Sequence, residues 1–430
     1  MRSTCCCPAE GLSWLDALAP EKPDAFLTPP MPGIPASGAS GIVGLWPRLE
    51  WRLGANGDSG GGKQELARFC DPAHTGPGPA LGYMNYEAGF EALGLPAPSS
   101  PPEFPPGVFR KYRAVLSPSP DARHVFIHAD SPKLAREAAR LVQSAPKAPP
   151  APLPSFSGPL RASLDAGGYR SAVRRALEHI LDGDAYQLNL SIRFDTSWPS
   201  GLDPASLFTH LLRERPAMFY ALFQLGGQAI VSTSPERFIQ VRNGRVLSQP
   251  IKGTRPAAPG AVCDLLASPK EDAELSMIVD LIRNDISPHC RYGSVRVEGH
   301  KSIFEVDGLL QMYANVTGEL RPGSTALDLL WDALPPGSVT GCPKCRAAQI
   351  IADLEPHRRE VYCGCMVMAH GPRDLDSSVA IRTALADPAR NLFSFFAGSG
   401  IVVESDPESE YRETLAKAEK FLALTRRNQP

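Results

Sequence analysis

Apolar residues recur at every second position in several short runs through the middle of this chain, which is the spacing of half-buried strands. In the first run, Leu188 and Leu190 are predicted to face one way while Gln187 faces the other. Asn243-Gly244 separates the last two runs, and this dipeptide favours a two-residue hairpin turn. The pattern therefore predicts strands at residues 185–194, 217–225, 228–232, 238–241 and 245–249.

A helical period of 3.6 takes over in other segments, and it predicts helices at residues 163–182, 271–286, 324–334, 343–354 and 404–422. Between them, apolar runs predict strands at residues 295–297, 311–320, 360–368, 377–384 and 392–396, the last entering a glycine loop at 397–400. Clustered strands with interspersed helices and no regular βαβ units favour an α+β fold over a doubly wound sheet.

The segment 1–160 differs in composition from the rest of the chain, because proline and glycine are concentrated there. Residues 54–62 and 96–106 are predicted to be loops, and residues 145–159 a proline-rich linker. Apolar runs predict strands at 41–53, 80–86, 108–116 and 125–129. We therefore expect a β-rich N-terminal region of low helical content at residues 1–160, followed by a catalytic domain at residues 161–426.

Composition excludes several classes of function. The net charge of -2 and the lack of a basic run argue against nucleic-acid binding, and no 18-residue apolar stretch could span a membrane. The N-terminus lacks the apolar segment of a secretory signal, so a reducing, cytoplasmic location is expected, with the ten cysteines as free thiols. Cys342, Cys345, Cys363 and Cys365 could form a zinc site, but small apolar fillers are the favoured interpretation.

Lys252 is the first candidate for chemistry, in the stretch Gln249-Pro250-Ile251-Lys252-Gly253-Thr254. Pro250 fixes its own φ and Gly253 permits backbone conformations that a Cβ would forbid, so a tight loop is predicted around the lysine. A partly desolvated lysine can lose its proton near neutral pH and attack carbon. The alternative is a surface lysine in a turn.

Carboxylates form the second candidate group. Glu410, Glu413 and Lys417 fall at i, i+3 and i+7 of the last predicted helix and so share one face, which is also the pattern of an ordinary solvated salt-bridge stripe. Glu274 lies among apolar residues of another predicted helix. Acids from two helices suit a Mg²⁺ ion that keeps several waters and also binds a substrate carboxylate.

Residues that could bind an anion form the third candidate group. Arg382 is predicted to lie in an apolar strand, where an arginine needs a partner such as a carboxylate. The predicted helix after residue 341, with Lys344 near its start, suits an anionic ligand. Neutral hydrogen bonds are expected from Ser338, Tyr362 and the amides near Gly398 and Gly400. Together these groups describe a pocket for a small polycarboxylate with a metal at one end.

Residues 161–426 resemble the chorismate-utilising enzymes, and within them most closely the aminodeoxychorismate synthases. Six segments in the same order carry the resemblance: Ser234-Pro235-Glu236-Arg237-Phe238, the segment 250–254, Ala273-Glu274 with M-I-V-D-L-I-R-N-D at 277–285, and the segments 337–344, 380–383 and 406–417. The family fold is a sandwich of two packed antiparallel-rich sheets flanked by helices. It agrees with the α+β expectation.

The resemblance implies a mechanism. Mg²⁺ would be held by Glu274 and Glu413, with Glu410 acting through water, and would bind the ring carboxylate of chorismate. Lys252 would attack C2 while Glu236 protonates the departing C4 hydroxyl, and ammonia would then enter at C4. The enolpyruvyl carboxylate would be held by Arg382 and Tyr362, with further contacts from Gly253, Thr254, Ser338, Gly398 and Gly400. No glutaminase motif is present, so ammonia would come from solution or from a separate glutamine amidotransferase subunit.

A few positions bear on the subgroup. Lys252 matches the aminodeoxychorismate synthases, because anthranilate synthases carry a small residue there. Gln187 stands where isochorismate and salicylate synthases have a lysine base, and glutamine cannot deprotonate water. Gln311 replaces a histidine common in the family, which makes pyruvate elimination by this chain less expected. The alternatives are an anthranilate or 2-amino-2-deoxyisochorismate synthase, and a non-catalytic chorismate-binding homologue.

Overall fold

The computed structural model describes residues 3–9, 12–29, 40–54, 59–144, 152–214, 217–306 and 308–426. Its helices are α1 (Ser59–Cys70), α2 (Pro72–Thr75), α3 (Pro132–Gln143), α4 (Ala166–Leu181), α5 (Pro204–Glu214), α6 (Ala261–Leu266), α7 (Pro269–Ile286), α8 (Ala326–Ala333), α9 (Lys344–Leu354) and α10 (Pro407–Arg426). Within these residues, no helix is long and apolar enough to cross a membrane.

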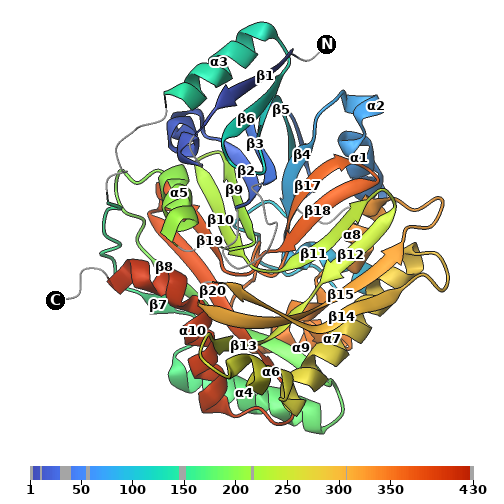
Figure 1. Ribbon diagram of the computed structural model, residues 1–430. Coiled ribbons are helices and arrows are strands. Elements are labelled where there is room, and N and C mark those ends of the chain that lie inside the picture. Colours follow the sequence, from blue (N-terminus) through green and yellow to red (C-terminus); the bar gives the residue numbers. More distant parts are fainter. Residues whose placement is uncertain are drawn as a thin grey trace.

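The strands divide between the two halves of the chain (Figure 1). The first half contributes β1 (Ser3–Pro8), β2 (Asp24–Thr28), β3 (Ser40–Arg52), β4 (Ala80–Met84), β5 (Gly107–Pro118), β6 (His124–Ala129), β7 (Arg161–Ala162), β8 (Gln187–Thr196) and β9 (Phe219–Leu225). The second contributes β10 (Gln228–Ser234), β11 (Arg237–Arg242), β12 (Arg245–Gln249), β13 (Ile251–Pro256), β14 (Arg296–Val306), β15 (Leu309–Glu319), β16 (Gly341–Cys342), β17 (Cys365–Gly371), β18 (Asp374–Val379), β19 (Thr383–Asp387) and β20 (Leu392–Ile401).

Pairing of these strands is antiparallel throughout and follows two paths that meet at β5. One path runs β8, β20, β19, β10, β9, β2, β3 and β5. The other runs β5, β4, β17, β18, β11, β12 and β15, with β13 and β14 both paired to β15. The predicted α+β fold, rich in antiparallel strands and flanked by helices, is confirmed, and hydrogen bonds join the two paths into one continuous sheet.

Two apolar cores pack against the strands of these two paths. Alternate residues of β9 enter different cores, with Phe219 and Phe223 in one and Tyr220 and Leu222 in the other. The first core takes residues from strands of both paths and from α7 and α8, while the second packs α4, α5, α9 and α10 onto the β8–β20 side. A strand covered on both faces is apolar at consecutive positions, which is why β9 is nearly all hydrophobic.

Local signals in the sequence placed several elements well. The predicted hairpin forms between β11 and β12, with left-handed φ values at Asn243 (51°) and Gly244 (77°), as its tight turn requires. Helix α4 begins after Asp165, whose side chain accepts a hydrogen bond from the Gly168 amide. Thr325 forms a capping box with Asp328 at the start of α8.

Five predictions of local structure are wrong. The N-terminal region contains helices α1 and α3 as well as strands, and residues 59–62 of the predicted loop 54–62 belong to α1. Residues 397–400 continue strand β20, and the strand predicted from residue 360 begins only at Cys365. The strand predicted at 377–384 is broken into β18 and β19. Residues 55–58, and residues 145–151 of the predicted linker, lie outside the described residues.

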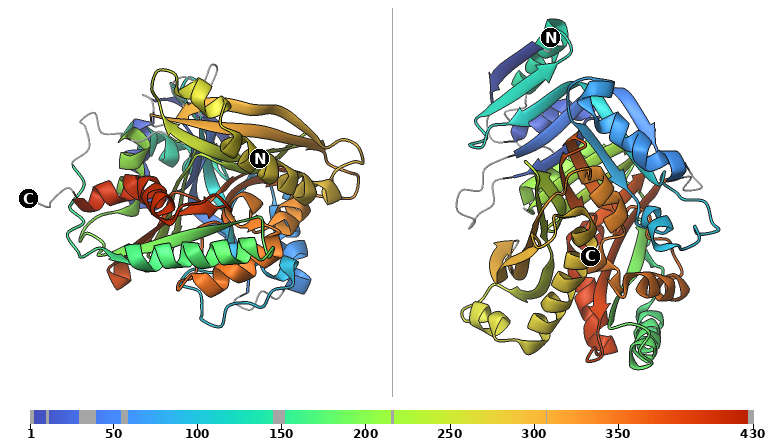
Figure 2. Two further views of the ribbon diagram at one scale, coloured as in Figure 1. Left: turned by 90° about the horizontal axis from the view of Figure 1, so that it is seen from below. Right: turned by 90° about the vertical axis from the view of Figure 1, so that its right-hand side faces the viewer.

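Strands from both sides of residue 160 pair with each other: β2 with β9, and β4 with β17. The parts of the chain before and after residue 160 therefore contribute strands to the same sheet, as the two views of Figure 2 also show. The predicted division into regions 1–160 and 161–426 stays a prediction.

Candidate active site

Lys252 lies in strand β13, not in the loop that the sequence predicted. The register between β13 and β15 shifts between Lys252, opposite Met312, and Thr254, opposite Gln311. Gly253 occupies the shift with a φ of 75°, a left-handed conformation that glycine adopts without strain. This β-bulge interrupts the strand next to the lysine, in the lower half of the molecule in Figure 1, where β13, β20, α6, α7 and α10 approach one another.

Three side chains from two strands converge on Gly400 of β20. A Cβ built on this glycine would lie 2.7 Å from Gln187 Nε2, 3.3 Å from Asn189 Oδ1 and 3.3 Å from Lys252 Nζ. Gln187 is fully buried, and neither atom of its amide has a hydrogen-bond partner among the described residues. Unpartnered buried amide atoms beside an amine are typical of a site that awaits a polar ligand.

Gly400→Ala is expected to lower turnover of the natural substrate by about a hundred-fold while leaving the fold intact, because the new methyl group meets only side-chain ends that can move aside. Steady-state kinetics and thermal unfolding measure the two effects. Gly398→Ala is the contrasting variant, since its methyl group would lie 2.3 Å from the Leu190 carbonyl oxygen and should lower the melting temperature instead. Full activity of Gly400→Ala would show that this space is not used.

Burial lowers the pKa of the Lys252 amine, and nearby Lys417 lowers it further, while Glu274, Glu236 and Glu413 act in the opposite direction. The lysine residue as a whole is half-buried. A lowered pKa increases the fraction of neutral amine near pH 7, which is the form that attacks carbon.

Glu236 supplies a proton donor close to this amine. It follows β10, is 4% exposed, and accepts a hydrogen bond of 2.5 Å from the Ser338 hydroxyl. Burial raises the pKa of this carboxyl to about 7, although the Ser338 hydrogen bond and the positive charges of Lys252 and Lys417 lower it in part. A carboxylic acid with a pKa near the working pH is suited to general acid catalysis.

Ser338→Ala should shift the alkaline limb of the pH–rate profile to higher pH. The serine hydroxyl donates to Glu236, so its removal destabilises the carboxylate and raises the pKa of the acid. The profile of kcat against pH measures the shift. Thr340→Val is the matched control from the same loop, because the Thr340 hydroxyl donates to the Pro336 carbonyl oxygen and not to Glu236.

An acidic cluster faces Lys252 from two helices. Glu271 and Glu274 come from α7, while Glu410 and Glu413 come from α10. Burial raises the pKa values of Glu271, Glu274 and Glu410, and in each case the negative charge of Glu413 contributes. The pKa of Glu413 is lowered instead, because Lys417 Nζ lies 2.6 Å from its carboxylate.

The sequence predicted a Mg²⁺ site at Glu274, Glu410 and Glu413 of this cluster, and that site stays a prediction. Glu410 is 3% exposed, and one of its carboxylate oxygens is buried without a hydrogen-bond partner among the described side chains, while Ser405 donates to the other. Within the described residues no group of three or more His, Cys, Asp or Glu side chains is placed to hold a metal ion. Two carboxylates are nevertheless enough for Mg²⁺ when substrate and water supply the other oxygens.

Glu271 is the member of this cluster that the sequence analysis missed. Its Oε2 would lie 2.9 Å from a Cβ on Gly253, so its carboxylate lies beside the bulge next to Lys252. Glu271 precedes Glu274 by three positions on α7, and residues at this spacing share a helix face. That spacing was the signal in the sequence that could have identified it.

Arg382 does not lie in a strand, contrary to the prediction. It lies in the break between β18 and β19 with a φ of 48°, and its carbonyl oxygen accepts hydrogen bonds from the Thr233 amide and hydroxyl. Tyr362 is buried, and its ring stacks on Phe396 with centroids 5.1 Å apart. The Val379 amide donates a hydrogen bond to the backbone carbonyl oxygen of Glu236. This bond places the segment that leads to Arg382 beside Glu236, the candidate general acid.

Lys344 does not present a free charge at the start of α9. It is buried and forms a 2.7 Å ion pair with Asp285 of α7, so the predicted anion site there is not supported. Arg359, also missed from the sequence, donates to Glu355 and to the carbonyl oxygens of Val339 and Asn189. It thereby ties the Ser338 loop to strand β8.

The remaining predicted residues line the same region or stay predictions. Gly398 and Gly400 are the two partly exposed residues in the otherwise buried stretch 397–401, so their backbone is accessible to a ligand. Thr254 is exposed and Gln311 is buried with an unpartnered amide oxygen. The cysteines are free, with Cys342 and Cys345 partly buried and Cys363 and Cys365 buried, which agrees with the apolar-filler interpretation.

Comparison with known proteins gives consistent matches. The pattern of the family described as chorismate binding enzyme matches residues 59–423. Anthranilate synthase component 1 of Streptomyces coelicolor is 35% identical over 404 residues, covering 85% of this chain and 76% of the relative. Aminodeoxychorismate synthase component 1 of Klebsiella aerogenes is 36% identical over 352 residues, covering 80% and 76%. These two relatives carry different enzyme names but are almost equally identical to this chain. Sequence identity therefore gives the family and not the product of the reaction.

Solved structures agree with these matches. The crystal structure of anthranilate synthase component I from Streptococcus pneumoniae superimposes with a TM-score of 0.77 at 27% identity, covering 92% of this chain and 94% of that one. The structure of MenF, the menaquinone-specific isochorismate synthase from Escherichia coli, has a TM-score of 0.72 at 20% identity and shows likeness of fold alone.

Proposed function

We propose that this chain, which belongs to the chorismate-binding enzyme family, is an aminodeoxychorismate synthase component that converts chorismate and ammonia to 4-amino-4-deoxychorismate and water. Membership of the family makes it a chorismate-utilising enzyme of the anthranilate and aminodeoxychorismate synthase group. One observation carries the choice of product. The amine of Lys252 lies beside Gly400, facing an acidic cluster and a carboxylic acid with a pKa of about 7.

The proposed reaction uses the lysine as a transient nucleophile. The neutral Nζ of Lys252 attacks C2 of chorismate, the ring double bonds shift, and the C4–O bond breaks as Glu236 gives its proton to the departing hydroxyl, which leaves as water. Ammonia then attacks C4, the double bonds shift back, and the C2–N bond to Lys252 breaks. Glu236 recovers a proton from the incoming ammonia, so the enzyme is unchanged at the end.

The polar groups around the amine have supporting roles in this proposal. Gln187 and Asn189 lie near enough to Gly400 to offer hydrogen bonds to the ring substituents. Arg382 and Tyr362 would hold the enolpyruvyl carboxylate, with the backbone of Gly253, Thr254, Gly398 and Gly400 in contact with the substrate. Glu274 and Glu413 would hold a Mg²⁺ ion, with Glu410 acting through water. The metal would neutralise and orient the ring carboxylate of chorismate.

Removal of divalent cations with EDTA is expected to abolish turnover, and added Mg²⁺ should restore it. The cluster of Glu271, Glu274, Glu410 and Glu413 repels an anionic substrate unless a cation offsets its charge. Chorismate consumption followed by absorbance measures the effect, and a rise in melting temperature on adding Mg²⁺ gives a readout independent of activity. Glu274→Gln should remove both effects. Undiminished turnover in EDTA would contradict the metal assignment.

Ammonia would come from a second protein. The relatives are named component 1 of their synthases, which implies another component, and this chain shows no glutaminase motif among its own residues. We therefore propose a separate glutamine amidotransferase subunit as partner, with free ammonium able to replace it at high pH.

Identification of the product tests the proposed function directly. The protein is incubated with chorismate, Mg²⁺ and ammonium, and the products are separated by chromatography and identified by mass and by reference compounds. Under the proposal, 4-amino-4-deoxychorismate accumulates without release of pyruvate. Anthranilate as the main product would contradict the proposal.

Anthranilate or 2-amino-2-deoxyisochorismate synthesis is the second candidate. It is favoured by the relative from Streptomyces coelicolor, which covers 85% of this chain and is named anthranilate synthase component 1. In that case ammonia would attack C2 of chorismate directly, and Lys252 would lie near the ring without forming a bond to it. A non-catalytic homologue is less well supported, because Lys252, Glu236, Glu274 and Glu413 are all present.

A further inference from the structure

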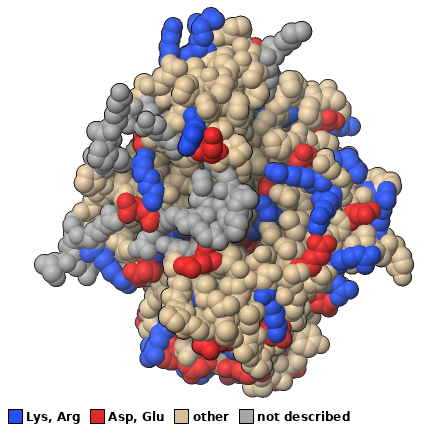
Figure 3. Space-filling view, viewed as in Figure 1, with Lys and Arg blue, Asp and Glu red and all other residues tan. Residues whose placement is uncertain are grey.

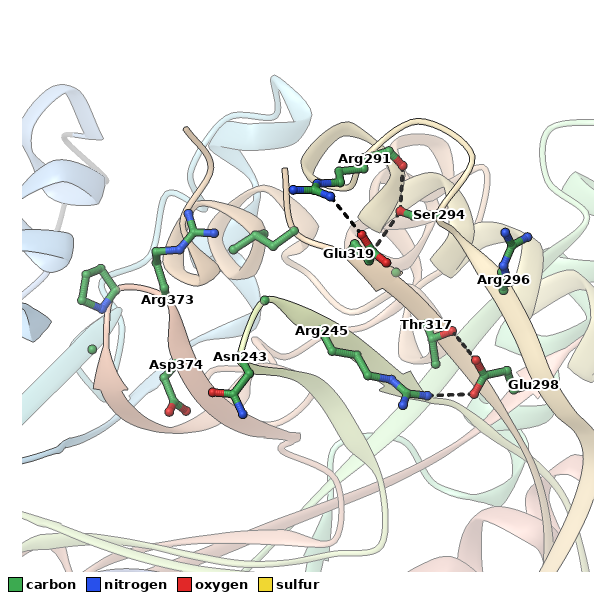
Figure 4. A pocket seen from close by; sticks show the side chains of 15 residues that line it. Asn243, Arg245, Arg291, Ser294, Arg296, Glu298, Thr317, Glu319, Arg373 and Asp374 are labelled. Atoms are coloured by element: carbon green, nitrogen blue, oxygen red, sulfur yellow. Dashed lines mark hydrogen bonds and ion pairs between the residues drawn. The ribbon is translucent and has the colours of Figure 1, made fainter. Parts of the chain in front are cut away.

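A cavity lies at the end of strand β12 remote from Lys252 (Figure 4). Its volume is about 1000 Å³, and none of the residues assigned to chorismate lines it. The walls come from the β11–β12 turn, the segment from Arg291 to Glu298, the end of β15, and the β17–β18 turn. The proposed function leaves this cavity without a role.

Guanidinium groups surround the cavity. Arg245, Arg291, Arg296 and Arg373 line it, against the carboxylates of Glu298, Glu319 and Asp374, so four positive charges face three negative ones. The four arginines come from three separate parts of the chain, as Figure 4 shows. Blue Lys and Arg atoms also gather on the right-hand part of the face in Figure 3. A concave, positively charged site concentrates field lines and attracts anions.

Three of these arginines make polar contacts within the protein. Arg245 pairs with Glu298 at 2.9 Å, and the Thr317 hydroxyl donates to the same carboxylate at 3.1 Å. Arg291 pairs with Glu319 at 3.4 Å. The side chain of Arg373 donates to the Ser324 carbonyl oxygen at 2.5 Å.

These contacts leave most donors of each guanidinium available. An arginine side chain has five N–H groups in a planar fork that matches a carboxylate or a phosphate. The bonds described above use one donor of Arg245, one of Arg291 and one of Arg373.

We infer that this cavity is a second ligand site, which takes a small polyanion bearing carboxylate or phosphate groups. Several guanidiniums around one cavity favour a ligand with two or more anionic groups, since each can pair with a different arginine. The volume of about 1000 Å³ admits a molecule of metabolite size. The inference is independent of the reaction proposed at Lys252.

Titration calorimetry on the full chain at low ionic strength tests this site, with citrate as the carboxylate probe and inorganic phosphate as the phosphate probe. One citrate is expected to bind per chain, and the relative affinities of the two probes identify the preferred anion. The Arg245→Ala/Arg373→Ala double variant should bind at least ten-fold more weakly. Arg426→Ala, which removes an exposed arginine paired with Glu419 on α10, should bind like the parent chain.

A further variant separates this site from the active site. Lys252→Met should retain citrate binding, because Lys252 does not line the cavity. Melting temperatures of all variants establish that they are folded. The inference is overturned if neither anion binds the parent chain at millimolar concentration, or if the double variant binds as tightly as the parent. Loss of citrate binding in Lys252→Met would also overturn it.

Discussion

Lys252→Ala is expected to reduce formation of the 4-amino product by about a thousand-fold or more, because it removes the amine that forms the bond to C2, while nearby Lys417 is held in an ion pair with Glu413. Without the lysine, ammonia can occupy the vacated space and attack C2 instead. A switch from 4-amino to 2-amino product would therefore accompany the loss of rate. Product analysis by chromatography and mass measures both effects in one experiment.

Intact-protein mass gives a second readout for the lysine. With chorismate present and ammonia withheld, the parent chain should gain the mass of chorismate less one water, since attack at C2 expels the C4 hydroxyl. Lys252→Met keeps a side chain of similar length without the amine, so it controls for packing and should show no adduct. Lys63→Ala removes a lysine that pairs with Asp332 and should react like the parent. Unchanged 4-amino synthesis in Lys252→Ala would refute the nucleophile assignment.

Glu236→Gln is expected to lower kcat by about 10² to 10⁴, the usual range for loss of a general acid. The glutamine oxygen can still accept the hydrogen bond from Ser338, so the change removes the proton and little else. In the parent enzyme the acid must be protonated, and burial raises its pKa to about 7, so kcat should fall as pH rises through 7. This alkaline limb should disappear from the profile of Glu236→Gln.

The chain offers a matched control for this pH dependence. Glu87 is another buried carboxyl whose pKa is raised to about 7 by burial, but the charged groups that act on it are Arg358 and Glu360, and Lys252 is not among them. Glu87→Gln should keep the alkaline limb. A limb that persists in Glu236→Gln, or one that vanishes in Glu87→Gln, would mean that Glu236 is not the group that titrates.

Much of the local structure could be read from short-range signals. Asn243-Gly244 predicted its hairpin because only residues that tolerate left-handed φ values fit both turn positions. The helix predicted at residues 163–182 forms as α4, and its start is local in origin because the carboxylate of Asp165 satisfies the Gly168 amide at the helix N-terminus. These signals depend on neighbours within a few residues, so no tertiary information is needed to interpret them.

Two of the errors share one cause, which is that tertiary pairing overrode a local preference. Residues 397–400 were predicted to be a loop because glycine disfavours strands, yet they form part of β20. A Cβ on Gly398 would lie 2.3 Å from the Leu190 carbonyl oxygen, so close packing of β20 against β8 requires glycine there. Lys252 lies in a strand for a similar reason, since β15 supplies a partner for β13.

By itself, the sequence determined the family, the α+β fold and a short set of residues capable of acid, amine and metal chemistry, since these follow from residue types, local spacing and ordered motifs. Only the tertiary structure decided that Glu236 is buried against Ser338, that Gln187 and Lys252 meet at Gly400, and that Glu271 joins the acidic cluster. The physical reason is that a pKa or a contact depends on solvent exclusion and on charges from segments far away in the chain. Neither is encoded in the local pattern of residues.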